Sequence, residues 1–370
     1  MMSDQERVRR ITNLSRRGLI RVAAGVSATA LATPFLWRRA DGAQSIVCAD
    51  PGGVYSTAFA EAFYKPFEKE TGIQVVSVGR PGNPSAQIKA QVEAKSYQWD
   101  MSAGITSDIQ LLLIENGLLD KLDLSGPDIA AIPANMKSDY YLANGVVTFL
   151  LAYRTDRLAG KNLESFADIW DVQKFPARRS LRKFVRDTIE IAMRADGVAG
   201  GPDIYKSLSA PGGWDRAFKK LDQIKSQIVV WWDAAPQSTQ LLSTGEVDIC
   251  PTFNARAQNA IDAGAPVRVV WEGGFYSAEG WVVLKGTPKA DLCRQFVKFC
   301  ARADRQAAYT RTLTNGPTNP DAYKHIEKKQ AELLPTYPAN FKGTAELDNA
   351  FWGTHKDTAG ARFNEWLLKS

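Results

Sequence analysis

Two pairs of adjacent polar residues have the chemistry to bind a small charged molecule. Arg186 and Asp187 place a guanidinium beside a carboxylate, and an amino carboxylate needs one acid together with an arginine or a helix N-terminus. Thr106 and Ser107 stand where a helix is predicted to begin, so their hydroxyls and the free N–H groups there could bind a carboxylate or a phosphonate. Each pair has a simpler interpretation, because charged residues often form a solvated face at a helix start and Thr106 is a good helix cap.

No catalytic constellation accompanies these residues. The two histidines, His325 and His355, lie in the polar C-terminal segment without metal-ligand spacing. The sequence contains no nucleophile elbow, no phosphate loop and no metal-binding helix pair. It therefore predicts binding rather than catalysis, with no metal and no cofactor.

Short apolar runs alternate with helical patterns, which is typical of an α/β protein whose strands are joined by crossover helices. Three successive βα units at the start favour a parallel sheet. Pro66 is expected to break the first helix and Gly72 to end it. The predicted strands of this part are Ser45–Ala49, Ile73–Val78 and Trp99–Ala103, and its helices are Tyr55–Thr71, Pro84–Ala94 and Asp108–Asn116.

A second series follows a long apolar strand at Val146–Tyr153. No internal repeat, low-complexity tract or long linker interrupts the chain. The further predicted strands are Ile228–Trp232, Val247–Thr252, Val267–Trp271 and Gly280–Leu284, and the further helices are Phe166–Trp170, Val185–Arg194, Trp214–Ile224, Gln237–Leu242, Ala255–Ala263 and Ala290–Arg302.

The first 43 residues have the features of an export leader. Ser15-Arg16-Arg17-Gly18-Leu19-Ile20-Arg21 precedes the apolar run Val22–Trp37 and resembles a twin-arginine signal. This run is interrupted by Thr33 and Pro34 and is shorter than the roughly 20 apolar residues of a spanning helix. We expect cleavage after Gly42 and a periplasmic protein, and an uncleaved membrane anchor is the alternative.

The leader accounts for the basic character of the chain, which has a formal net charge of +6. Removing it takes away eight of the 46 basic and three of the 40 acidic residues, which leaves 38 and 37. A nearly neutral body gives no reason to expect nucleic acid or acidic membranes as partners.

The rest of the chain is longer than one typical domain of roughly 100 to 200 residues and predicts two domains. Cys293 and Cys300 belong to one predicted helix, in which their separation is roughly 10 Å and exceeds disulfide distance. Cys48 and Cys250 lie in apolar, strand-like runs. We therefore predict buried free thiols.

A series of short motifs stands in order between residues 45 and 325: Cys48-Ala49-Asp50-Pro51-Gly52-Gly53-Val54-Tyr55, Pro66–Ile73, Trp99-Asp100-Met101, Glu115–Leu119, Ser165–Trp170, Thr244–Asp248 and Gly316-Pro317-Thr318-Asn319. In this order and spacing they resemble the periplasmic solute-binding proteins of the polyamine (spermidine/putrescine) type, extracellular solute-binding family 1. Members of that family deliver small solutes to ATP-binding cassette (ABC) importers.

The resemblance implies an α/β protein with the two-lobed periplasmic-binding-protein (type II) fold, each lobe a mixed five-stranded sheet flanked by helices. The first lobe would comprise residues 44–150 and 279–325, and the second residues 151–278 and 326–370. Ligand in the cleft between the lobes would favour a hinge-closed state that an inner-membrane permease can recognise. A protein that docks in this way is expected to be a monomer.

The resemblance also implies ligand contacts. Tyr55 falls at a ligand-stacking aromatic of the family, Thr106 and Ser107 at a ligand loop, and Asp187, beside Arg186, at an acid that holds the ligand amine. Trp232 and Asp233 end a strand and suit stacking and ammonium binding, although alternation places either Trp231 or Trp232 in the core. The other expected contacts are Phe253 and Asn254, which replace a Trp-Asn pair, and Tyr276, Glu279 and Trp281 around the return crossing.

The chain departs from the polyamine-binding pattern in ways that affect the ligand. The aromatic and the aspartate that grip a polyamine ammonium do not align cleanly, and Gly316 replaces a late tyrosine. Fewer acidic side chains around the ligand, with Arg186 beside them, favour a smaller amine or an amino acid over a dication. Polyamine, γ-amino-acid and aminophosphonate ligands all stay open.

Two other functions are compatible with parts of the sequence. Twin-arginine export often carries proteins folded around cofactors, so a periplasmic enzyme with a bound cofactor is one alternative. The adjacent Tyr140 and Tyr141 indicate a ferric-ion-binding protein of the same fold as another. However, this pair precedes the first crossing, where the iron-binding relatives do not place their tyrosines.

Overall fold

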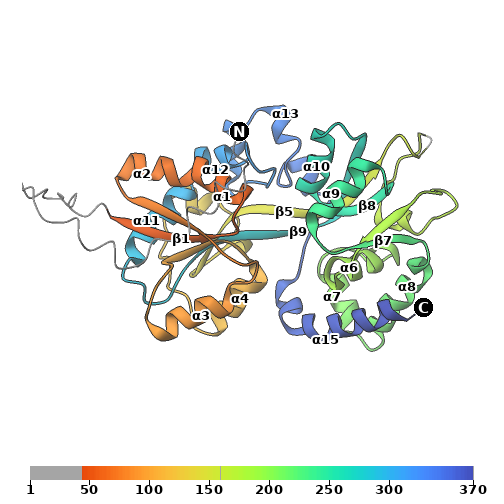
Figure 1. Cartoon of the computed structure of the whole chain (residues 1–370), viewed down its shortest axis with the longest axis horizontal. Helices are drawn as coiled ribbons and strands as arrows, with labels where there is room; N and C mark the ends of the chain where they lie inside the picture. The colour runs from red at the N-terminus through yellow and green to blue at the C-terminus, as the bar shows by residue number, and fades with distance from the viewer. Residues whose placement is uncertain (1–43, 159, 370) are drawn as a thin grey trace, which may run out of the picture. The chain divides into compact units, whose positions relative to one another are not determined.

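The computed structural model describes residues 44–158 and 160–369, which form one compact unit (Figure 1). The predicted leader, with its twin-arginine motif and cleavage site, lies outside the described residues. In the described part of the chain, no helix is long and apolar enough to cross a membrane.

One mixed sheet of ten strands runs through the described residues, in the order β2-β1-β3-β9-β5-β8-β6-β7, with β4 added to β5 and β10 to β9. Strand β1 is parallel to β2 and β3, as the succession of βα units predicts. The strands are β1 (Ser45–Asp50), β2 (Gln74–Gly79), β3 (Met101–Thr106), β4 (Lys137–Ser138), β5 (Tyr141–Arg154), β6 (Arg179–Arg182), β7 (Ile228–Trp232), β8 (Ile249–Phe253), β9 (Val267–Val283) and β10 (Ala345–Glu346).

Helices cover this sheet (Figure 1). They are α1 (Val54–Phe59), η2 (Ala60–Tyr64), α2 (Lys65–Thr71), α3 (Ser85–Ala94), α4 (Ser107–Glu115), α5 (Pro127–Ala131), η3 (Ala134–Met136), η4 (Phe166–Ile169), α6 (Val185–Ala195), α7 (Pro202–Ser209), α8 (Gly213–Lys225), α9 (Ala235–Thr244), α10 (Asn254–Asp262), α11 (Ala290–Cys300), α12 (Ala303–Tyr309), η5 (Pro320–His325), α13 (Lys328–Ala331), α14 (Pro338–Phe341) and α15 (Asn349–Leu368).

The long strands β5 and β9 connect the two halves of the molecule. They pair antiparallel from Leu142 opposite Trp281 to Arg154 opposite Val267. One end of β9 also pairs with β3 and one end of β5 with β8, so both strands belong to both halves (Figure 1). The β5–β9 register shifts at two places, and such irregularities bend a strand locally.

Buried apolar side chains form two clusters, one in each half. The first cluster gathers the helices around β1, β3 and the end of β9, and Trp281 packs in it against Phe59 with ring centroids 5.1 Å apart. The second gathers α6, α8 and α15 around β7 and β8, and Trp232 stacks in it on Phe149. These two cores and the shared mixed sheet confirm the predicted two-lobed α/β fold.

The fold differs from the sequence prediction in several details, and the elements α5, α7, α12, α15, β4 and β10 were not predicted. The first helix is irregular before Pro66 rather than at it, because Pro66 offers no N–H to the carbonyl of Ala62 and the preceding turn widens into the π-helical η2. The two runs predicted as separate strands around residues 267–271 and 280–284 are the ends of β9. Strand β6 was not predicted, because its sequence, Arg-Ser-Leu-Arg, contains one apolar residue and so lacks an apolar run.

Two smaller predictions are confirmed. Gly72 ends α2 in the left-handed conformation, with φ 74°. All four cysteines are buried and free, which fits their positions in the helix α11 and the core strands.

Candidate functional site

A cavity of about 340 Å³ brings together four of the predicted site residues. Tyr55 comes from α1, Phe253 from the end of β8, Asn254 from the start of α10 and Glu279 from β9. Arg256 on α10 also lines the cavity. The first core cluster supplies Tyr55 and the second packs against Phe253, so both halves of the molecule form the walls.

Two acids line this cavity, the exposed Asp262 and the half-buried Glu279. The Oε1 of Glu279 accepts a hydrogen bond from the Tyr55 hydroxyl at 3.4 Å, whereas its Oε2 is buried without a hydrogen-bond partner. Burial raises the pKa of Glu279 to about 7, although the Tyr55 hydrogen bond and the charge of Arg80 act in the opposite direction. A buried oxygen without a donor is a place where a bound ammonium would be stabilised.

Arg80, which the sequence did not single out, is held rigidly near Glu279. Its Nη2 donates to the carbonyls of Ala103 and Gly104 at 2.7 and 2.8 Å, and its Nη1 donates to Pro81. A lone arginine after a strand gives no sequence signal, because the carbonyls that bind it come from β3.

Asp187 is 1% exposed and forms an ion pair with Arg182. The Arg182 guanidinium also lies over the rings of Phe184 and Phe253, 4.7 and 5.2 Å from their centroids. The charge of Asp187 is therefore already balanced by a residue that the sequence did not identify. Its Oδ1 is nevertheless buried without a hydrogen-bond partner.

Arg186 reaches from α6 towards α4. Its Nη1 lies 3.6 Å from Oδ2 of Asp108, and its Nε is buried without a hydrogen-bond partner. Thr106 donates to the other oxygen of Asp108 at 2.5 Å, and Thr106 stands opposite Glu279 in the β3–β9 register. These contacts link Arg186, which does not itself line the cavity, to the position of Glu279 through Asp108 and Thr106.

The hydroxyls of Thr106 and Ser107 have protein partners. Thr106 occupies the N-cap position of α4 without capping through its side chain, because its hydroxyl donates to Asp108. The Ser107 hydroxyl donates to the carbonyl of Ala278 at 3.4 Å. Both residues are half-buried, and neither lines this cavity.

Several predicted contacts are not brought to this cavity. Trp232 and Trp281 are fully buried in the two cores. Asp233 is exposed after β7. Asn254 lines the cavity, but its amide accepts from the Thr148 N–H and donates to the Thr314 carbonyl, so its role is to connect three segments. We therefore leave the two tryptophans and Asp233 out of the candidate site.

Tyr276 contacts Asn135 and Glu346, which line a second cavity of about 510 Å³ together with Ser107 and Tyr205. The Tyr276 hydroxyl donates to Glu346 at 3.4 Å, and Asn135 donates to the same carboxylate oxygen at 2.9 Å. This cavity is larger, but both of its acids already accept hydrogen bonds: Glu346 accepts two, and Asp348 caps α15 by accepting from the Phe351 N–H. We place the ligand amine at Glu279, whose Oε2 has no donor.

The tyrosine pair considered for iron is not arranged as a metal site. Tyr141 is buried and donates its hydroxyl to the Ile105 carbonyl at 3.2 Å, whereas Tyr140 lies near Lys121. Among residues 44–158 and 160–369, no three His, Cys, Asp or Glu side chains are grouped to hold a metal ion.

Comparison with known proteins identifies relatives over most of the chain. Residues 62–336 match the family described as "Bacterial extracellular solute-binding protein". The chain is 35% identical to the gamma-aminobutyric acid-binding protein of Pseudomonas aeruginosa over 88% of this chain and 92% of the relative. It is 22% identical to the spermidine/putrescine-binding periplasmic protein of Escherichia coli over 82% and 86%. A solved GABA receptor superimposes with a TM-score of 0.77 at 30% identity, covering 88% of this chain and 98% of that one.

Proposed function

The chain belongs to the bacterial extracellular solute-binding proteins, and we propose that its ligand is a small solute with one amine and one carboxylate, of the γ-aminobutyric acid class. Proteins of this family bind small molecules and work with ABC permeases. We infer the ligand class from the pairing of acids and arginines at the candidate site.

The observation that carries the proposal is the unequal pairing of acids and arginines. Asp187 and Glu279 each have one unbonded oxygen, but Asp187 is balanced by Arg182, whereas Glu279 has no ion pair within the described residues, so we place the ammonium at Glu279. Arg186 has two long ion-pair contacts, 3.6 Å to Asp108 and 3.9 Å to Asp187, and its Nε makes no hydrogen bond, so we take it as the arginine open to a carboxylate. One open acid and one open arginine suit a zwitterion better than a dication, which needs two separated carboxylates.

The relatives support the same ligand class. Both the curated relative at 35% identity and the solved receptor at 30% bind γ-aminobutyric acid by name, whereas the polyamine-binding relative is only 22% identical. The polyamine type that the motifs resembled is therefore the weaker alternative.

The strands β5 and β9, which belong to both halves of the molecule, indicate how the protein closes over its ligand. We propose that the halves are the two lobes, with boundaries near residues 150 and 279, and that they close over the ligand by bending at the register shifts of β5 and β9. A monomer in the periplasm, exported by the twin-arginine route, completes the proposal.

Calorimetric titration of the protein tests the ligand class. We expect γ-aminobutyrate to bind with a Kd in the micromolar range or below, and putrescine and spermidine to bind at least about 100-fold more weakly, since they lack the carboxylate. If 2-aminoethylphosphonate binds more tightly than γ-aminobutyrate, the preferred ligand carries a phosphonate in place of the carboxylate, and the proposed site is unchanged. Tighter binding of putrescine, or no binding by any of these four solutes, would overturn the proposal.

A further inference from the structure

Glu190 is a buried carboxylate with three donors from three parts of the chain. It is 0% exposed. Its Oε1 accepts from Trp352 Nε1 at 2.5 Å and from the Tyr205 hydroxyl at 3.2 Å, and its Oε2 accepts from the backbone N–H of Asp187 at 2.8 Å. A buried acid in the middle of a helix is costly unless it is fully hydrogen-bonded, so this position has a specific role.

The Asp187 backbone is strained at the point that Glu190 contacts. Asp187 has φ 74° and ψ −48°, whereas Arg186 before it is extended, so the first turn of α6 is kinked. A non-glycine residue at positive φ persists only where its surroundings hold it. The hydrogen bond from Asp187 N to Glu190 is one such restraint, and the Asp187–Arg182 ion pair is another.

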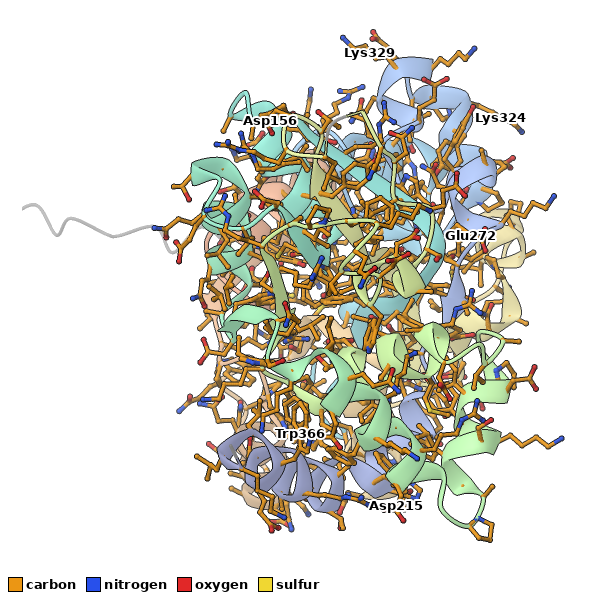
Figure 2. All side chains as sticks on the ribbon, turned by 90° about the vertical axis from the view of Figure 1, so that its right-hand side faces the viewer. Asp156, Asp215, Glu272, Lys324, Lys329 and Trp366 are labelled. Atoms are coloured by element: carbon orange, nitrogen blue, oxygen red, sulfur yellow. The ribbon has the colours of Figure 1, made fainter. Side chains whose placement is uncertain are left out.

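The other side of Glu190 is fixed by the C-terminal helix. Trp352 lies near the start of α15 and is buried in the second core. Further along this helix Trp366 donates to Asp222, and Arg362 donates to Asp215, so α15 is fastened to α8. Figure 2 labels Trp366 on α15 and Asp215 on α8. Tyr205 adds a second fixed donor from α7.

We propose that Glu190 is a positioning residue of the ligand site: it fastens the kinked Arg186–Asp187 turn to α7 and α15 and so holds Arg186 where it meets the ligand carboxylate. This inference rests on the proposed function for its ligand, but the restraint on the Asp187 backbone exists without ligand. Two other groups face Glu190 besides its donors, the Asp187 carboxylate and the Arg186 guanidinium.

Glu190→Gln is the sharpest test, because glutamine keeps the shape but replaces one acceptor oxygen by an NH₂ donor. The new NH₂ group must face either the Asp187 N–H or the Trp352 and Tyr205 donors. The variant therefore loses either the hydrogen bond from Asp187 or those from Trp352 and Tyr205. Asp248→Asn is the matched control, since Asp248 is a buried acid of the same half that binds Arg178 instead. We expect roughly 10-fold weaker γ-aminobutyrate binding for Glu190→Gln and unchanged binding for Asp248→Asn.

Amide exchange of Asp187 in the ligand-free protein, followed by NMR with ¹⁵N-labelled aspartate, supplies a second measurement. We expect faster exchange in Glu190→Gln and in the milder Trp352→Phe, but not in Asp248→Asn. Equal exchange and equal affinity changes in Glu190→Gln and Asp248→Asn would overturn the positioning role. If the wild-type protein binds no amino carboxylate, the proposed function fails, and the exchange comparison still decides the role of Glu190. If Glu190→Gln does not fold, Trp352→Phe is judged by the same two measurements.

Discussion

Arg186 Nη1 lies 3.6 Å from Asp108 Oδ2, and this ion pair joins α6 of one half of the molecule to α4 of the other. The 3.6 Å separation is longer than a hydrogen bond, so Asp108 holds Arg186 only weakly. An incoming carboxylate can therefore replace Asp108 at Arg186 at little energetic cost.

Asp108→Asn should tighten γ-aminobutyrate binding by a few-fold. The substitution removes the acid that competes for Arg186 and the negative charge that repels the ligand carboxylate. Calorimetry of this variant, with the exposed-pair variant Asp139→Asn as a control, measures the effect. Weaker binding would mean that Asp108 itself holds the ligand.

Glu279→Gln should weaken ligand binding by roughly 100-fold or more, because the ammonium loses a buried charged partner. Tyr55→Phe should have a smaller effect, since only the orientation of the carboxylate is lost. Glu346→Gln changes the acid of the second cavity and should leave the affinity unchanged. If Glu346→Gln weakens ligand binding and Glu279→Gln does not, the ligand amine lies in the larger cavity.

Arg182→Met and Arg186→Met should separate stability from binding. Arg182→Met leaves the buried Asp187 with only its 3.9 Å contact to Arg186 and should cost roughly 3 kcal/mol of unfolding free energy. Arg186→Met should change that free energy by less than about 1 kcal/mol but weaken the ligand about 10-fold or more. Thermal denaturation and calorimetry check both effects, and similar behaviour of the two variants would argue against their separate roles.

The pH dependence of stability should differ between the wild type and Glu279→Gln. The pKa of Glu279 is raised from 4.5 to about 7 in the folded protein. Its contribution to stability is therefore fully present below pH 4.5 and is lost as the pH rises through 7. The unfolding free energy of the wild type should fall relative to the variant over this window, by up to roughly 3 kcal/mol. Ligand affinity of the wild type should rise over the same window, because the ammonium pairs with the ionised acid. Parallel stability curves for the two proteins would contradict this assignment.

Replacement of Arg16 and Arg17 by lysine should block export and retain the precursor in the cytoplasm, because the twin-arginine route requires the adjacent arginines. Cell fractionation with an antibody measures the distribution. Normal export of the double variant would mean that another route carries the protein.

The sequence predicted the fold better than it predicted the site. Alternating strands and helices were enough for the two-lobed α/β class, because each element carries its own hydrophobic period. The partner of Asp187 could not be predicted, since Arg182 ends a short strand whose charged termini hide the strand pattern. Similarly, alternation in Trp231-Trp232 could not tell which ring faces inward, and only the packing of Trp232 on Phe149 decides it.

Other parts of the site depend on contacts between distant segments. Arg80 is held by carbonyls of β3, and Glu190 is satisfied by α7 and α15, so neither stands out in its own local sequence. Polar residues inside an otherwise ordinary helix, such as Glu190, are usually solvated, and only their burial in the fold identifies them.

A crystal structure of the protein with γ-aminobutyrate would test the central claim most directly. We predict that the ligand ammonium lies within hydrogen-bond distance of Glu279 Oε2 and that its carboxylate contacts Arg186, with Asp108 displaced. A ligand bound in the reverse orientation, or with its ammonium at Glu346, would contradict this account of the site.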